Sequence, residues 1–267
     1  MRVRIRLDLA YDGLAFAGWA RQPDQRTVQG CLEDGLARVL SVPDVAVTCA
    51  GRTDAGVHAL GQVAHADIPA GVGEPTSLAR RLNGVLPDDV RVHGCVEAPA
   101  GFDARFAALW RRYRYQVCDQ VAVDPLSRGQ VLQWRRPVDI DVMNEAAEGL
   151  VGEHDFAAYC RPRPGATTRR VLHELVWCRE GRLAVLTARA DAFCHHMVRS
   201  LTGALLVVGE GRRPVGWPAD VLRAAHRDGA VPVVPAHGLT LTEVGYPPDA
   251  ELAERAERTR RRRVPQS

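Results

Sequence analysis

Lysine is missing from this sequence, and all 35 of its basic residues are arginine. Codon usage alone accounts for such a bias. Arginine is, however, also the side chain that forks onto phosphates and stacks on nucleobases. Composition does not decide between these two causes, so the placement of the arginines along the chain has to.

The cysteines are widely scattered along the chain. The seven residues are an odd number and form no C-x-x-C pair, so we expect neither a disulfide framework nor a zinc site. They are typical of small buried hydrophobic residues. Cys194, His195 and His196 are consecutive, but adjacent side chains point in different directions and no H-E-x-x-H spacing occurs, so we expect no metal there.

Long hydrophobic runs are also missing. The longest, residues 203–208, is far below the roughly 18 residues that a membrane span needs. The first residues alternate arginine with apolar side chains and lack the apolar core of a signal peptide. With 46% hydrophobic and 25% charged residues over 267 positions, we expect a cytoplasmic globular protein without a membrane partner, of one large or two modest domains.

The common cofactor and nucleophile motifs are absent as well. There is no Walker A pattern and no G-x-S-x-G elbow. Gly71-Val72-Gly73 lacks the third glycine and the strand–turn–helix context of a dinucleotide site. Any enzymatic activity is therefore expected to need no bound cofactor.

The first hundred residues alternate between strand and helix patterns. Residues 3–9 are apolar at every second position, which predicts a strand with one wet face. Thr27 is a candidate N-cap for a helix that ends near Leu40. We expect further strands at 45–50, 62–68 and 90–96, a linker at 70–75 and a short helix at 76–82. This order predicts an α+β layer, with helices on one face of an antiparallel sheet.

A comparable order begins again at Trp110. We expect strands at 113–117, 171–178 and 183–190, a helix at 142–151 and a long helix from about Ala192. The chain is thus divided into an N-terminal half (1–107), a C-terminal half (108–247) and a basic tail (248–267) that we expect to be flexible and solvated. A cleft between two such halves is the default place for a substrate.

Residues 50–65, AGRTDAGVHALGQVAH, place Asp54 behind an arginine and between two glycines. Turns collect aspartate and glycine for local reasons, so a plain turn explains this spacing. Alternatively, the carboxylate is catalytic. On an extended backbone Arg52 lies on the same side as Asp54 and can hold its carboxylate ionised and in place. An aspartate is an anion at neutral pH and can attack without a separate base, so Asp54 is the candidate nucleophile.

A second constellation interleaves arginine with aromatic residues in WRRYRY, residues 110–115. An extended backbone places Arg111, Tyr113 and Tyr115 on one face and the other two arginines on the opposite face. A stacking plane beside phosphate contacts is what a flipped base needs. An ordinary amphipathic strand with a charged outer face has the same pattern.

Two further basic features are candidates for nucleic-acid contacts. One is a segment with the composition of a mobile loop, which contains Arg161, Arg163 and Arg169. If this segment lies beside a cleft, its arginines can bind a phosphate backbone; otherwise it is an ordinary polar loop. Arg199 lies on the expected long helix, away from its apolar stripe, where an arginine is usually a solvated charge.

Taken together, these segments resemble the tRNA pseudouridine synthase A family over nearly the whole chain, up to about Pro247. The GRTDAGVH block is highly specific. Its order with the other matching segments makes coincidence implausible; they are AYDGLAFAGWARQ, RTVQGCLEDGL, LNGVLPDDV, FDARFAALWRRYRY, GEHDFAAYC, DAFCHHMVRSLTGALLVVGEG and GLTLTEVGYP.

The resemblance implies a cofactor-free isomerase that flips a uridine at positions 38–40 of the tRNA anticodon arm and converts it to pseudouridine. It implies two related RRM/ferredoxin-like α+β halves with a continuous, mostly antiparallel sheet, a basic active-site cleft between them, and a homodimer. By the same resemblance Asp54 is the catalytic aspartate, Tyr113 packs against the target base, and Arg52 and Arg199 are catalytic arginines. The expected RNA contacts are Phe102, Arg105, Phe106, Arg161, Arg163 and Arg169.

Two positions depart from the family pattern. Ala20 replaces a glutamine, and Asp103 replaces the histidine of FHARF, which puts an anion where RNA is expected nearby. A non-catalytic RNA-binding protein is the main alternative, although no RNP1-type segment is present, and a catalytic effect of Asp54 distinguishes the two. A nucleosidase or nuclease is a third class, which would release a base or cut the chain.

Overall fold

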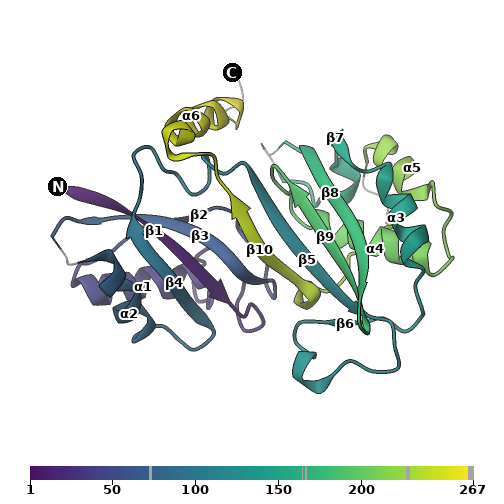
Figure 1. Cartoon of the computed structure of the whole chain (residues 1–267), viewed down its shortest axis with the longest axis horizontal. Helices are drawn as coiled ribbons and strands as arrows, with labels where there is room; N and C mark the ends of the chain where they lie inside the picture. The colour runs from purple at the N-terminus through teal and green to yellow at the C-terminus, as the bar shows by residue number, and fades with distance from the viewer. Residues whose placement is uncertain (72–73, 164, 166, 227–228, 264–267) are drawn as a thin grey trace. The chain divides into compact units, whose positions relative to one another are not determined.

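The computed structural model describes residues 1–71, 74–163, 165, 167–226 and 229–263. Its strands form one large mixed sheet that is mostly antiparallel, which confirms the expected α+β class (Figure 1). The chain divides into two compact units, residues Met1–Leu109 with Leu241–Ser267, and residues Trp110–Thr240. The end of the chain therefore returns to the first unit, whereas the sequence placed residues up to 247 in the second.

The first unit contains a sheet in the order β4, β1, β3, β10, with β2 paired to β3. Ile5, Leu7 and Leu9 face the core at every second position of β1, as the alternation predicted. Helix α2 packs over β4 and against α1. The elements are β1 (Arg2–Tyr11), α1 (Val28–Leu40), β2 (Val47–Cys49), β3 (His58–Pro69), α2 (Pro75–Asn83), β4 (Val90–Glu97), β10 (Leu239–Gly245), η4 (Asp249–Glu251) and α6 (Leu252–Arg263).

The second unit contains a sheet in the order β5, β9, β8, β7, with the short β6 parallel to β5. Helices α3, α4 and α5 pack against one another, and α3 also packs on β8. The elements are β5 (Trp110–Cys118), η1 (Pro125–Ser127), β6 (Leu132–Gln133), α3 (Ile140–Glu148), β7 (Gly152–Asp155), η2 (Ala157–Tyr159), β8 (Arg169–Glu180), β9 (Leu183–Ala190), α4 (Met197–Gly209), α5 (Trp217–Ala224) and η3 (Ala236–Gly238).

Helix ends agree with the sequence where a cap fixes them. The Thr27 side chain accepts a hydrogen bond from the Gly30 amide at 3.2 Å, so the predicted N-cap of α1 is confirmed. Helix α4 begins at Met197 rather than near Ala192, because His196 takes a left-handed conformation (φ 68°) that no α-helix continues through.

The segment after Pro248 differs from the expected flexible tail. It forms η4 and α6, and Leu252 and Ala256 are buried. An apolar residue at i and i+4 is the narrow stripe by which a helix attaches to a core. Of the expected linker at 70–75, residues 72 and 73 lie outside the described residues, as do the side chains of Arg262 and Arg263.

In the described part of the chain, no helix combines the length and the apolar character needed to cross a bilayer.

The structure also differs from the sequence-based expectation in its cysteines. Cys160 and Cys194, which we expected to be unpaired, form a disulfide within the second unit, with Cα atoms 5.7 Å apart. Their separation of 34 residues carries no sequence signature, so only the fold brings them together.

Candidate active site

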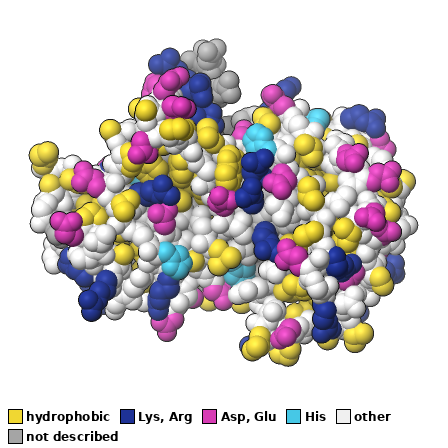
Figure 2. All heavy atoms as spheres, in the orientation of Figure 1, with side chains coloured by type: hydrophobic (Ala, Val, Ile, Leu, Met, Phe, Trp, Pro, Cys, Tyr) yellow, Lys and Arg dark blue, Asp and Glu magenta, His cyan; other side chains and the backbone are white. Residues whose placement is uncertain are grey.

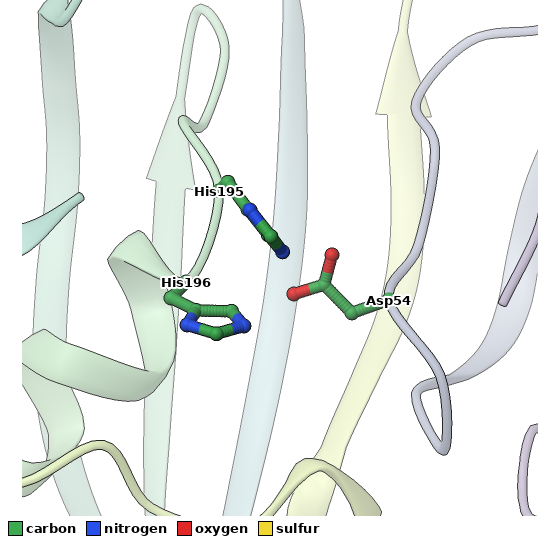
Figure 3. A group of neighbouring side chains, drawn as sticks. All are labelled: Asp54, His195 and His196. Atoms are coloured by element: carbon green, nitrogen blue, oxygen red, sulfur yellow. The ribbon is translucent and has the colours of Figure 1, made fainter. Parts of the chain in front are cut away.

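Asp54 lies on the loop that joins β2 to β3 in the first unit, and Figure 3 shows its carboxylate at the end of a short side chain. Along this loop Arg52 is exposed, Thr53 is buried and Asp54 is half-buried. That alternation is what the extended-backbone argument predicted, because it places Thr53 on one side and its two neighbours on the other. The predicted role of Arg52 in holding the carboxylate stays a prediction.

A buried polar network holds the loop from inside. The Tyr11 hydroxyl lies 2.7 Å from the Thr53 hydroxyl. The Gln62 amide donates to the Gly51 carbonyl at 2.8 Å and to the Tyr11 hydroxyl at 3.3 Å. Since Gln62 and Thr53 are buried, an unmade bond here would cost the full desolvation of a polar group. The network therefore fixes the backbone on both sides of Arg52.

Glycines close the loop on its other side. Gly56 has φ +79° and follows Asp54 in a turn closed by a 3.2 Å bond from the Val57 amide to the Asp54 carbonyl. Gly18 has φ +99°, and a Cβ there would lie 3.0 Å from the Thr53 carbonyl oxygen. A turn after Asp54 already explains Gly56 from the sequence. Only the fold shows that Gly18 lets the segment before α1 lie against the Asp54 loop.

Strand β5 in the second unit has the two faces that the sequence predicted. Arg111, Tyr113 and Tyr115 are buried on one face. Tyr113 meets the ring of Phe193 edge-on, with centroids 5.1 Å apart. The opposite face fits the plainer interpretation, since Arg114 forms an ion pair with Glu180 at 2.5 Å. Only the Tyr113 face is therefore a candidate for base recognition.

The segment between β9 and α4 carries Phe193, His195 and His196, and Figure 3 shows the two imidazoles on this segment. Its backbone is fixed, because the Arg161 amide donates to the His195 carbonyl at 2.9 Å and the disulfide joins Cys194 to Cys160. The sequence marks the histidines only as improbable metal ligands and places Phe193 on the buried stripe of the long helix, whereas Phe193 precedes α4 and its ring meets Tyr113. A phenylalanine three residues before a histidine gives no signal until the strand beside it is known.

Arg199 lies in the first turn of α4 and is half-buried. Its Nε donates to the Val234 carbonyl at 2.7 Å. This bond uses one edge of the guanidinium to fix the side chain to the loop before η3. Arg199 is therefore not the freely solvated charge that a lone helical arginine usually is.

The FDARF segment, residues 102–106, supplies the first group of expected RNA contacts. Phe102 is only 1% exposed and packs against Tyr246, with ring centroids 5.1 Å apart, so its ring belongs to the core and not to a contact surface. Arg105 is exposed and Phe106 half-buried, with the guanidinium carbon 5.1 Å from the ring centroid. Contact of these two residues with RNA stays a prediction.

The second group lies between η2 and β8. Arg161, Arg163 and Arg169 are all exposed, as a phosphate-binding segment requires. Pro164, in the same segment, lies outside the described residues. Thr168 anchors the end of the segment, because its hydroxyl donates to Asp155 at 2.6 Å. Sequence and structure agree on exposure, and contact with RNA stays a prediction.

A pocket of about 290 Å³ lies in the first unit, apart from the Asp54 loop. Its walls include Arg6, whose guanidinium carbon lies 5.6 Å from the ring centroid of Phe102 and 5.4 Å from that of Tyr246. Leu252 at the start of α6 forms another part of the wall. Of the residues that the sequence singled out, the pocket includes Phe102.

Comparison with known proteins decides the family. The family model described as tRNA pseudouridine synthase matches residues 9–107 and 146–247. This chain belongs to the tRNA pseudouridine synthase family. The match includes the Asp54 loop and Arg199, whereas Tyr113 falls between its two segments.

Individual relatives in this family match almost end to end. A tRNA pseudouridine synthase A of Frankia casuarinae is 60% identical over 98% of this chain and 96% of its own length. One from Streptomyces griseus is 60% identical over 97% of this chain and 93% of its own. One from Streptomyces avermitilis is 56% identical over 98% and 94%, respectively. The resemblance read from the motifs is thereby confirmed.

Proposed function

We propose that this chain, a tRNA pseudouridine synthase, isomerises uridine at positions 38–40 in the anticodon arm of tRNA, with Asp54 as its catalytic carboxylate. The single observation that carries the assignment of Asp54 is the way the loop is built. Thr53 is locked inward by Tyr11, and the next residue is a half-buried aspartate before a glycine turn. A merely solvated turn needs no such network beneath it.

The reaction gains and loses no group overall. The N1–C1′ glycosidic bond breaks, the uracil turns while it stays bound, and C5 bonds to C1′ as C5 loses a proton and N1 gains one. No redox step or group donor is needed, so we propose that the enzyme works without a cofactor. Asp54 either attacks C1′, attacks C6 or removes a proton from C2′, and all three routes need an anion placed at one nucleotide.

The remaining roles follow from side-chain chemistry. A base inside the arm has to leave its stack, at a cost of a few kcal/mol that contacts to the flipped base offset. We assign Tyr113 to the face of the uracil, because its ring is already held edge-on by Phe193. Arg52 and Arg199 orient Asp54 and the nucleotide, in a basic cleft between the two halves. A cytoplasmic location and a homodimer complete the proposal.

The decisive test replaces Asp54 by asparagine, which keeps the shape of the side chain and removes its charge. We expect Asp54→Asn to lower tritium release from tRNA labelled at uracil C5 by at least about 10³-fold, because the covalent or base step is lost. Affinity for tRNA, measured by filter binding, should change less than about threefold, since one carboxylate contributes little to binding a polyanion.

Asp44→Asn is the matched control, because Asp44 is an exposed aspartate of the same unit. It should leave tritium release unchanged. Substantial turnover by Asp54→Asn would refute the assignment of the carboxylate. Retained binding with no tritium release by the wild-type protein on any tRNA would favour the non-catalytic RNA-binding alternative. Release of free uracil or cut RNA would favour hydrolysis.

A further inference from the structure

The C-terminal helix α6 is attached to the same loop that carries the expected RNA contacts Arg105 and Phe106. Gly101, at the start of this loop, has φ +78°, and a Cβ there would lie 2.5 Å from the Ala253 Cβ. Only glycine permits so close an approach. The Arg255 guanidinium donates to the Ala108 carbonyl at 3.4 Å. The helix is thus a fitted part of the first unit.

An ion pair joins the two segments at their outer end. Arg260 of α6 donates to the Asp103 carboxylate at 2.7 Å, and the same carboxylate accepts the Arg105 and Phe106 amides at 2.9 and 2.8 Å. Burial disfavours the ionised form, but these donors outweigh it and the pKa of Asp103 lies below its ordinary value. Asp103 therefore holds the loop and the helix together and does not present an anion to RNA.

The Arg260–Asp103 ion pair also places two arginines beside the ring of Phe106. The guanidinium carbons of Arg105 and Arg260 lie 5.1 and 5.2 Å from the centroid of Phe106. Two cations beside a half-exposed ring are the combination with which proteins hold a nucleic-acid strand, a stacking plane next to phosphate contacts. The sequence placed one arginine there, and the fold adds a second from 155 residues further along the chain.

Helix α6 is strongly basic overall, with six arginines against two glutamates between residues 252 and 263. Figure 2 shows basic side chains beside acidic ones over α6. The glutamates pair along the helix, Glu254 with Arg258 at 3.7 Å and Glu257 with Arg261 at 3.3 Å. Exposed pairs of this kind are weak and screened by salt, so phosphates can recruit both arginines.

We propose that α6 and loop 101–106 form one binding surface for the phosphate backbone of tRNA, with the Asp103–Arg260 ion pair as its joint. This inference rests on the proposed function for the identity of the nucleic acid. Arg258 and Arg261 contact phosphates along the helix, while Arg105, Phe106 and Arg260 contact the strand at the joint. The surface adds affinity and takes no part in the chemistry at Asp54.

The test reverses charge on the outer side of the helix in the full-length protein. The double variant Arg258→Glu with Arg261→Glu is expected to raise the Kd for unmodified tRNA by about tenfold or more near physiological salt. The slope of log Kd against log salt concentration should decrease by the amount that corresponds to about two lost phosphate contacts. The turnover rate at saturating tRNA should stay within twofold of wild type, because Asp54 and its loop are untouched.

The matched control is Arg38→Glu with Arg80→Glu, which makes the same change in net charge at exposed arginines of α1 and α2 in the same unit. These helices lie well apart from α6 in Figure 1. The control should raise Kd less than threefold. Equal weakening in both double variants, or wild-type affinity in the α6 variant, would overturn the proposed surface.

A second variant tests the joint. Arg260→Gln should increase amide hydrogen exchange across residues 252–261 and raise the Kd for tRNA about threefold, while the thermal transition of the whole protein moves little. Exchange as slow as in wild type would overturn the role of Arg260 as the joint. The outcome is separate from that of Asp54→Asn: an inactive Asp54 variant together with wild-type binding by the α6 variants would refute the surface and leave the function standing.

Discussion

The loop that carries Asp54 is set by residues that never touch a substrate in the proposed reaction. The side chains of Tyr11, Thr53 and Gln62 form hydrogen bonds with one another beneath the loop. Gly18 leaves room for the neighbouring segment before α1. At the scale of single residues, the catalytic candidate was visible in the sequence because its own motif is distinctive. The residues that hold the loop could not be recognised from the sequence, because a glutamine or threonine in a strand pattern looks like any polar residue on a solvent-exposed face.

His65 is a buried residue whose ionisation couples stability to pH. Its Nδ1 accepts the Ala104 amide at 3.0 Å, which requires the neutral ring. Burial first, and then the charge of Arg4, lower its pKa, while Asp103 and Asp67 act in the opposite direction. The unfolded chain therefore takes up a proton at a higher pH than the folded one, and the stability that His65 contributes is lost as the pH falls below about 6.5.

We expect the free energy of unfolding to fall between pH 7 and pH 5, with His65 contributing at most about 1.4 kcal/mol per pH unit. His65→Gln should flatten this slope, because glutamine can accept the Ala104 amide without titrating. His93→Gln, at an exposed histidine of β4, should leave the slope unchanged. Urea unfolding at several pH values measures the slope, and identical slopes for wild type and His65→Gln would contradict the prediction.

At the scale of helices and strands, the sequence pattern predicts which face is buried but not where the element begins. The period of two in β5 predicted its buried face, because strand side chains alternate whatever the strand packs against. The start of α4 was predicted about five residues too early, because apolar spacing continues through residues 192–196 while the backbone at His196 does not. Local pattern fixes which side of an element is buried, and the contacts of its end decide where it begins.

The disulfide between η2 and the segment before α4 predicts a measurable stabilisation. Closing a loop of this length removes about 4 kcal/mol of unfolded-state entropy in the chain-entropy account. We expect a Cys160–Cys194 peptide in digests alkylated under denaturing conditions without reductant, and a melting temperature lower by about 10 °C after reduction.

Cys178→Ser is the matched control, because Cys178 is an exposed free cysteine of the same unit, and it should show the same drop on reduction. Alkylation of all seven thiols in the air-oxidised protein would contradict the pairing. Protein kept in a reducing buffer should resemble the reduced form, which is the state expected of thiols in a cytoplasm.

At the scale of the whole molecule, the C-terminal segment of the chain returns to the unit formed by the N-terminal residues. Residues 241–263 belong to the first unit, although the second unit precedes them in the sequence. The sequence predicts a boundary between residues 107 and 108, because the strand–helix order starts again there, and the first stretch of the first unit ends at Leu109. It did not predict the return, since nothing in GLTLTEVGYP says which strand it will pair with.

Asp54 belongs to the first unit and Arg199 to the second. Under the proposed function, a variant of Arg199 should therefore impair the chemistry assigned to Asp54. Arg199→Gln should lower the single-turnover rate about 10²-fold or more, since the half-buried cation proposed to orient Asp54 and the nucleotide is lost. The Kd for tRNA should rise only a few fold. Single-turnover tritium release at saturating enzyme separates the two effects.

Arg223→Gln on α5 serves as the control, because its side chain is 75% exposed and it should change neither quantity. Arg199→Lys keeps the charge but loses the planar fork, so it should recover only part of the rate. A rate close to wild type in Arg199→Gln would show that the second unit does not supply this cation.

The sequence by itself determined the α+β class, the buried faces of β1 and β5, and the candidacy of Asp54. Each of these depends on spacing over a few residues, which survives whatever the rest of the chain does. Only the tertiary structure decided that Phe102 is core, that Cys160 meets Cys194, and that Arg260 neutralises Asp103. Those outcomes join residues far apart in the chain, and burial, pairing and charge compensation are properties of the neighbours that folding supplies.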